Sequence, residues 1–155
     1  MKNVADISEQ QTALSPLADE PWADEIEVTA AYRDRLLIKH VEGPLFFGFA
    51  RGFLNIAARA AGVRLLVLRM DRVHLMDQSG AYALQDTLVD LKSSGTRVVL
   101  VGLPIAQRDI LEAIHVIPDL VSSEDLFADF AELKAALPKV LALIGATEQD
   151  VESKN

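Results

Sequence analysis

The stretch RLLVLRMDRVHLMDQSGAYALQDTLVDLKSSGTRVVLVGL, residues 64–103, decides the fold class. It opens with an almost continuous apolar run, residues 64–70, and a second such run follows at residues 96–102. Runs of this length and composition are typical of buried strands. Between them an apolar residue recurs at every third or fourth position, which predicts a helix with one buried face. This stripe consists of Ala81, Leu84, Leu88 and Leu91.

The ends of this helix are marked by residues that start and stop helices. Asp77 or Ser79 suits the N-cap, and Gly95 suits the turn that ends the helix. A strand, a helix and a strand with short connections place the two strands parallel, through a right-handed crossover. The stretch therefore predicts an α/β domain.

Further elements are expected before this unit. Residues 27–32 and 35–41 are short β-type runs, and they predict a hairpin that adds an antiparallel edge to the sheet. An apolar stripe then predicts a helix that begins near Pro44, ends at Gly62 and turns its aromatic side chains toward the sheet. The stripe consists of Phe46, Phe49, Ala50, Phe53, Ala57 and Ala60.

Two helices are expected after the second run. The first spans about residues 104–115, and the second begins at residues 122–125, where two serines can cap and two acids suit the helix dipole. The stripe of the second helix stops at Pro138 and contains Leu126 or Phe127, Phe130, Leu133 and Leu137. We expect a mixed, mostly parallel sheet of about four or five strands with about four or five helices.

Composition indicates one compact domain. The chain has 155 residues, half of them apolar, a net charge of −8 and no cysteine. The negative charge disfavours nucleic acid as a partner, and the missing cysteine excludes disulfides and thiolate chemistry. We see no signal peptide and no apolar window of membrane-spanning length, so we expect this polypeptide to be soluble.

The chain divides into three parts. Residues 1–25 are acidic and lack a period, which predicts a flexible arm or linker; residues 26–137 form the domain, and residues 138–155 a short helical extension and a polar tail. Trp22 is the exception within the arm. It is either an anchor for a partner or a side chain that packs on its own domain, and we favour packing.

The residues predict neither catalysis nor metal binding. His40, His74 and His115 lie on separate segments without the spacing of zinc ligands. Asp71 and Asp77 flank a loop, but a loop acid and a capping acid explain them better than a pair of catalytic carboxylates. We therefore expect a non-enzymatic domain with no metal and no cofactor.

We interpret Gly95 and Gly102 as isolated turn glycines. They form neither a phosphate-binding loop nor a dinucleotide-binding motif.

Two stretches carry a resemblance to a known family. VEGPLFFGFA, residues 41–50, followed by VHLMDQSGAYALQDTLVDLKSSGTRVVLVGL, residues 73–103, resembles the STAS domain, with its STAS (SpoIIAA-like) fold. This module is shared by bacterial anti-sigma-factor antagonists and by the cytoplasmic C-terminal region of SulP-type anion transporters. The Asp-x-Ser-Gly turn is general to the module, whereas GPLFF, residues 43–47, resembles the transporter branch.

The resemblance points to the junction MDQSG, residues 76–80, as the site. In the antagonists a kinase phosphorylates the serine that directly follows the aspartate, and this chain has Gln78 there, which cannot accept phosphate. We interpret Ser79 as a capping residue. The partner-binding or anion-binding loop and helix start is expected to comprise Asp77, Gln78, Ser79, Gly80 and Ala81.

The resemblance implies a regulatory, protein-interaction domain of a sulfate or related anion transporter. It would lie on the cytoplasmic face, tethered to the inner membrane through a transmembrane region that this chain lacks. Its expected partners are the membrane domain in cis, a soluble regulatory protein or a second copy in a homodimer. We expect the docking surface to include Gln85, Asp86 and Asp90.

Two alternatives remain open at this point. One is a free-standing anti-sigma-factor antagonist in a partner-switching circuit, which a start at Met1 and the missing membrane segment favour. The other is a module that senses a nucleotide or an anion at the helix start near Ser79, although no lysine or arginine stands in that motif.

Overall fold

A computed structural model of the chain describes residues 19–32, 34–42, 44–45 and 63–154. The chain begins its described part with a short 3₁₀ helix, η1 (Ala23–Glu25), and helix α2 (Ile26–Tyr32). The later elements are β1 (Leu36–Glu42), β2 (Leu65–Arg72), α4 (Gln78–Ser93), β3 (Arg97–Val101), α5 (Ile105–Ala113), α6 (Val116–Asp119), η3 (Ser123–Asp125), β4 (Leu126–Phe127) and α7 (Phe130–Lys154).

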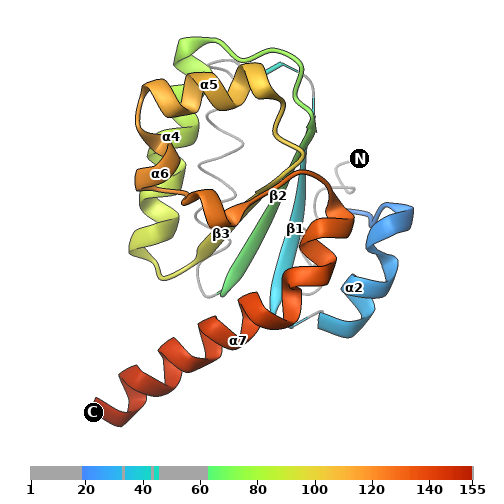
Figure 1. The fold of residues 1–155 in the computed structure, drawn as a ribbon, viewed down its shortest axis with the longest axis vertical. Coiled ribbons are helices and arrows are strands. Elements are labelled where there is room, and N and C mark those ends of the chain that lie inside the picture. Colours follow the sequence, from blue (N-terminus) through green and yellow to red (C-terminus); the bar gives the residue numbers. More distant parts are fainter. Residues whose placement is uncertain (1–18, 33, 43, 46–62, 155) are drawn as a thin grey trace, which may run out of the picture.

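The four strands form one sheet in the order β1-β2-β3-β4, and each neighbouring pair is parallel. Helices cover both faces of the sheet (Figure 1). Leu37, Leu66 and Leu100 face the layer of α4, α5 and α6. Leu36, Val67 and Val99 face α2 and α7, as the period of two along a strand requires. The predicted α/β class and the strand–helix–strand unit are confirmed.

The predicted hairpin was wrong. Residues 27–32 lie in helix α2, so the described sheet has no antiparallel edge there. The helix buries Val28 and half-buries Tyr32, four residues apart on one face. That spacing, rather than the alternation of a strand, decides the local structure.

The predicted start and end of the last helix were also wrong. Leu126 and Phe127 form strand β4, because the two side chains pack on opposite faces of the sheet. Helix α7 then begins at Phe130 and continues through Pro138, which is exposed. Val140 and Leu141 beyond the proline are buried in the core, and this burial offsets the hydrogen bond that a proline removes.

The helix predicted for residues 46–60 lies outside the described residues. Leu45, just before it, is fully buried, and its backbone bridges to Met76 in the loop before α4. Leu45 therefore belongs to the core, whereas Pro44 beside it is exposed. The helix predicted near residues 104–115 is confirmed as α5, with α6 following directly.

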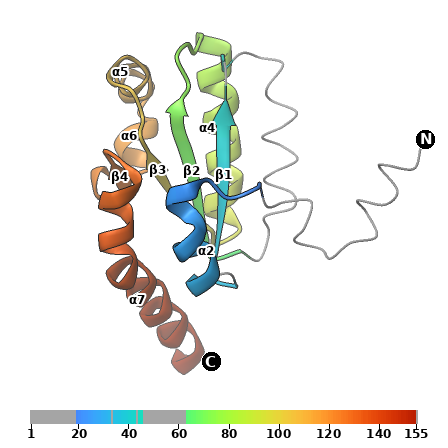
Figure 2. The ribbon, with the colours of Figure 1, turned by 90° about the vertical axis from the view of Figure 1, so that its right-hand side faces the viewer.

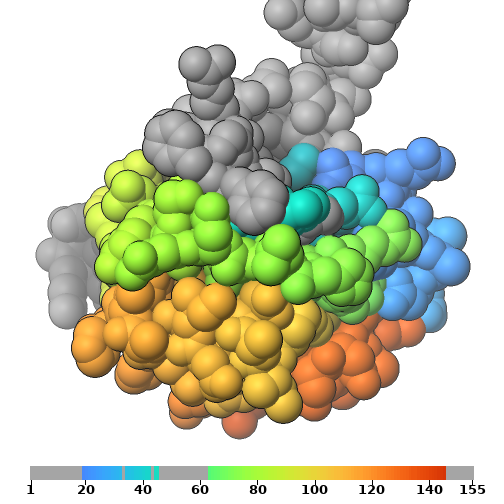
Figure 3. All heavy atoms as spheres, turned by 90° about the horizontal axis from the view of Figure 1, so that it is seen from above, coloured from blue at the N-terminus to red at the C-terminus, as the bar shows by residue number. Residues whose placement is uncertain are grey.

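The strands are parallel, so their carboxyl ends share one end of the sheet, and Figure 3 shows the molecule from the side to which these ends point. In Figure 2 the arrowheads of β1 and β2 point to this end, whereas α7 extends past the opposite one. None of the described helices is long and apolar enough to cross a membrane.

Candidate functional site

The start of α4 is closed by a side-chain cap. The Asp77 carboxylate accepts hydrogen bonds from the Gly80 backbone N–H at 2.7 Å and from the Ser79 hydroxyl at 2.9 Å. Asp77 is therefore the N-cap, and Ser79 supports it rather than capping the helix itself. Of the two caps left open by the sequence, the structure selects Asp77, so the interpretation of Ser79 as the capping residue was wrong.

The five residues predicted at this helix start have different exposures. Asp77, Gln78 and Ser79 are exposed, whereas Gly80 and Ala81, in the first turn of α4, are buried, and Ala81 belongs to the core. The Asp77 carboxylate already binds one N–H group of the turn and adds negative charge there. A second anion at this position would meet that charge, so the geometry opposes an anion site.

The outer side of α4 carries two exposed apolar residues, Tyr82 and Val89, which are 43% and 45% exposed. Asp86 is exposed between them, one turn from each. These three residues share one side of the helix and are called the α4 face below. Leu75 in the preceding loop is 54% exposed as well.

The three residues predicted for docking separate in the structure. Asp86 and Asp90 are exposed on α4. Gln85 is half-buried, and its side-chain amide donates a hydrogen bond to the Ile114 carbonyl at 3.3 Å, which holds α4 against the end of α5. Gln85 thus has a structural contact that the sequence did not indicate.

The two acids that flank the loop do not form a pair. Asp71 binds Arg69, whereas Asp77 caps α4. Within the described residues, no group of three His, Asp or Glu side chains is placed to hold a metal ion. Gly95 and Gly102 both adopt positive φ, at 84° and 72°, as turn glycines do.

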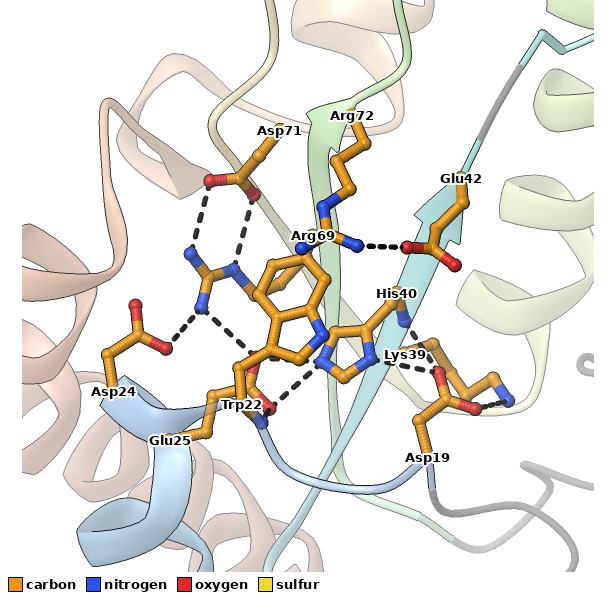
Figure 4. Close-up of polar contacts among 10 residues, drawn as sticks. All are labelled: Asp19, Trp22, Asp24, Glu25, Lys39, His40, Glu42, Arg69, Asp71 and Arg72. Carbon is orange, nitrogen blue, oxygen red and sulfur yellow. Dashed lines mark hydrogen bonds and ion pairs between the residues drawn. The ribbon is translucent and has the colours of Figure 1, made fainter.

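One polar cluster among the described residues was not predicted from the sequence. It lies at the carboxyl ends of β1 and β2, where residues 19–25 pack beside the sheet (Figure 4). Arg69 on β2 is only 5% exposed and stands in a row with Leu65 and Val67, whose side chains face α7. An arginine in such a row requires buried acidic partners.

These partners come from two directions. The Arg69 guanidinium donates from Nε and Nη2 to the two oxygens of Asp71 at 3.2 and 3.1 Å. Its Nη1 donates to Asp24 at 2.8 Å and to Glu25 at 3.0 Å. The guanidinium carbon lies 4.6 Å from the Trp22 ring centre and 4.7 Å from that of Phe130.

Burial by itself lowers the pKa of Arg69. The hydrogen bonds that Arg69 donates to Asp71 and Asp24 outweigh that effect and raise the pKa of Arg69 above its ordinary value. Arg69 is therefore a permanent cation, and the cluster is built around a fixed positive charge.

His40 on β1 forms the second half of the cluster. Its ring stacks on Trp22 with 4.0 Å between the ring centres and an interplanar angle of 4°. Its Nε2 lies 2.8 Å from Glu25 Oε2, and its backbone N–H donates to Asp19 at 2.8 Å. Glu25, which is 1% exposed, thus contacts both His40 and Arg69.

These contacts bear on two earlier expectations. Trp22 packs on its own domain, as predicted. The arm assigned to residues 1–25 includes seven residues, 19–25, that lie against the sheet. The boundary at residue 25 stays a prediction.

The signal for the cluster was Arg69 in an apolar strand, but the sequence did not identify its distant partners.

Comparison with known proteins agrees with this architecture. The sequence model of the STAS domain matches residues 27–133, more than half of the chain. A comparison with curated protein sequences found no match.

Solved structures show the same fold. A sulfate transporter family protein from Wolinella succinogenes is 24% identical, with a TM-score of 0.60 over 69% of this chain and 87% of its own. The STAS domain of a SulP transporter from Vibrio cholerae is also 24% identical, with a TM-score of 0.58 over 76% of this chain and 98% of its own.

The anti-sigma factor antagonist SpoIIAA, in its unphosphorylated form, is 14% identical, with a TM-score of 0.54 over 68% of this chain and 90% of its own. At these identities the three structures establish the fold alone. The family rests on the sequence match, and the four-stranded α/β architecture accords with it. The chain therefore belongs to the STAS domain family.

Proposed function

We propose that this chain is the regulatory STAS domain of a SulP-type transporter for sulfate or a related anion. It acts on the cytoplasmic face of the inner membrane, where it is tethered to a membrane domain in cis. The GPLFF corner supports this reading, because it resembles the transporter branch of the family. The fold shared with two transporter-associated structures is consistent with it.

The α4 face is the observation that carries the proposal. Two apolar side chains with an acid between them, exposed on one side of a helix, form a surface that a partner can cover. Asp77 orders the start of this helix, so the surface is preorganised. Docking there would bias the transport equilibrium by the difference in affinity for the transporter's states.

The proposal is non-enzymatic. The polar side chains at the start of α4 serve the cap, and Asp71 serves Arg69. Neither pair places a base next to a nucleophile in a cavity, which acyl transfer or hydrolysis needs. The test must distinguish the membrane domain from two other partners of the α4 face, a soluble regulatory protein and a second copy of the chain.

Site-specific photocrosslinking tests the proposal. A photoreactive phenylalanine is placed at Tyr82 or Val89 in the native polypeptide, in cells of the source organism, and adducts are mapped by mass spectrometry. The control position is Lys139, exposed on α7. We expect adducts from positions 82 and 89 to peptides of the transporter's own membrane domain. Equal yields from position 139, or adducts only to another protein, would contradict the proposal.

A second candidate function is favoured by one observation. Ser79 is exposed at the start of α4, where a kinase can reach its hydroxyl. Under this alternative the chain is a free-standing antagonist that phosphorylation switches. Incubation with the serine kinases of the source organism, followed by mass spectrometry with Ser79→Ala as control, tests it. Phosphate on Ser79 of the wild type alone would support the antagonist.

A further inference from the structure

Residues 19–25 are held to the domain by side chains at a few points. Asp19 binds Lys39 Nζ and the His40 N–H, each at 2.8 Å. At the other end of the segment, Glu25 binds His40 and Arg69. These contacts lie toward the carboxyl ends of β1 and β2.

The Arg69 guanidinium divides its hydrogen bonds between a fixed partner and a partner on the segment. Asp71, on the same strand, takes Nε and Nη2, whereas Asp24 and Glu25 of the segment take Nη1. If the segment moves away, Arg69 keeps its bidentate partner and gains water on the opened side. The cost of release is therefore lower than for a buried charge that loses every partner.

Little apolar surface holds the segment in place. Glu25 is the one buried residue among residues 19–25, Asp19 and Trp22 are half-buried, and the remaining four are exposed. Hydrophobic burial sets most of the cost of opening a structural unit. A segment held by ion pairs and one stacked ring opens at a smaller cost than the core, where the apolar side chains of β2 from Leu65 to Met70 are fully buried.

We propose that residues 19–25 form a latch that opens and closes as a unit while the rest of the domain stays folded. Closing covers Arg69 and pairs the backbone N–H of His40, on β1, with Asp19. Opening uncovers the Nη1 side of Arg69 and the ring of His40, next to Arg72, which is already exposed.

The latch makes the sheet edge responsive to the chain that precedes residue 19. A pull or a partner acting on that chain favours the open state, and a ligand that binds the uncovered Arg69 favours it as well. This inference goes beyond the proposed function, because it concerns the isolated chain and holds whether or not a membrane domain is attached.

Two probes report the latch separately from the core. Trp22 is the single tryptophan of the chain, so tryptophan fluorescence and its quenching by acrylamide report the segment alone. The His40 amide is hydrogen-bonded to Asp19, so its hydrogen exchange reports opening of the latch. The Val99 amide lies in β3, inside the sheet, and reports opening of the core.

In the full 155-residue chain, the His40 amide should exchange faster than the Val99 amide, and Trp22 should become accessible to quencher below the unfolding temperature seen by circular dichroism. Glu25→Gln should speed His40 exchange by about 10- to 100-fold, because it removes a charged hydrogen-bond acceptor. Val99 exchange should change less than His40 exchange. The matched control is Glu20→Gln, which removes the same charge from an exposed position of the same segment.

Equal exchange rates at His40 and Val99 in the wild type would overturn the proposal, because the segment would then open only with the whole domain. Equal effects of Glu25→Gln and Glu20→Gln would overturn it too. If Glu25→Gln does not fold, Asp24→Asn takes its place, since Asp24 is 52% exposed and contacts the same guanidinium nitrogen.

Discussion

Gly102 leaves the space that the Asp71 carboxylate occupies. A Cβ atom at position 102 would lie 2.6 Å from Asp71 Cγ and 2.8 Å from both carboxylate oxygens. Gly102 also adopts a φ of 72°, and its N–H donates to the Phe127 carbonyl at 2.9 Å. The turn after β3 thus positions the acid that anchors Arg69.

Replacing Gly102 by alanine should therefore destabilise the domain through two effects. The positive φ costs about 1–2 kcal/mol, and the contact with Asp71 adds about 1–3 kcal/mol of overpacking. Gly95→Ala is the matched control, because Gly95 has a φ of 84° and open space around its Cβ position. Chemical denaturation of both variants should show the larger loss for Gly102→Ala, and equal losses would contradict the packing role of Gly102.

Removing the cap of α4 should lower stability by about 1 kcal/mol. Asp77→Ala loses the hydrogen bond that the Gly80 N–H donates. Ser79→Ala, which keeps the cap, should change the free energy of unfolding by less than about 0.5 kcal/mol. A larger loss for Ser79→Ala, measured by urea denaturation, would show that Ser79 rather than Asp77 orders the helix start.

Arg69→Lys keeps the charge and tests the shape of the guanidinium. A lysine cannot bind Asp71 through two nitrogens and still reach Asp24 and Glu25. We expect a loss of about 1–3 kcal/mol in the free energy of unfolding. Arg72→Lys is the control, since Arg72 is 57% exposed and should lose less. Comparable losses for the two variants would mean that Arg69 acts through its charge alone.

Glu27 offers a test of pH dependence. The hydrogen bond and the charge of Lys134 lower the pKa of Glu27. The pair therefore stabilises the fold above the unfolded-state pKa of Glu27, and this contribution is lost as pH falls through the folded-state pKa. Because Glu27 is exposed, its effect on stability should be small.

The titration itself is the sharper measurement. Lys134→Met should raise the pKa of Glu27 toward its ordinary value, as followed by NMR of the Glu27 carboxyl carbon. Lys139→Met, at an exposed site on the same helix, should leave it unchanged. An unchanged titration in Lys134→Met would contradict the Glu27–Lys134 pair.

Reversing one charge on the α4 face should weaken docking without unfolding the domain. Asp86→Lys is expected to reduce the Tyr82-position crosslink by about tenfold, because the partner would meet a cation in place of the acid. Asp109→Lys makes the same change at an exposed position on α5 and should leave the yield unaltered. Equal yields for the two variants would remove Asp86 from the docking surface.

The sequence predicted those elements whose apolar pattern is long and regular. Strands β2 and β3 are nearly continuous buried runs, and α4 has one buried stripe over its whole length, so each pattern fits a single kind of element. The predictions for short elements were wrong, because a short apolar pattern fits more than one kind of element. The pattern of residues 27–32 fits a strand or a helix equally well. The contacts of Val28 and Tyr32 with the rest of the fold make this segment a helix.

The cap of α4 and the cluster around Arg69 differ in how far they could be predicted from the sequence. Asp77 was predictable as a cap, because a cap is local and lies at a fixed distance from the apolar stripe. The cluster around Arg69 joins residues more than 40 positions apart, and no spacing in the sequence records that contact. An arginine in an apolar strand signals the need for an acid but does not identify Glu25.

The size and location of the native polypeptide test the central claim most directly. Cells of the source organism are fractionated and blotted with an antibody raised to this domain, with antibody pre-absorbed on the purified chain as control. We predict a membrane-bound band several times longer than this chain, as a transporter with a tethered STAS domain requires. A soluble band of the size of this chain would contradict that account and would favour a free-standing antagonist.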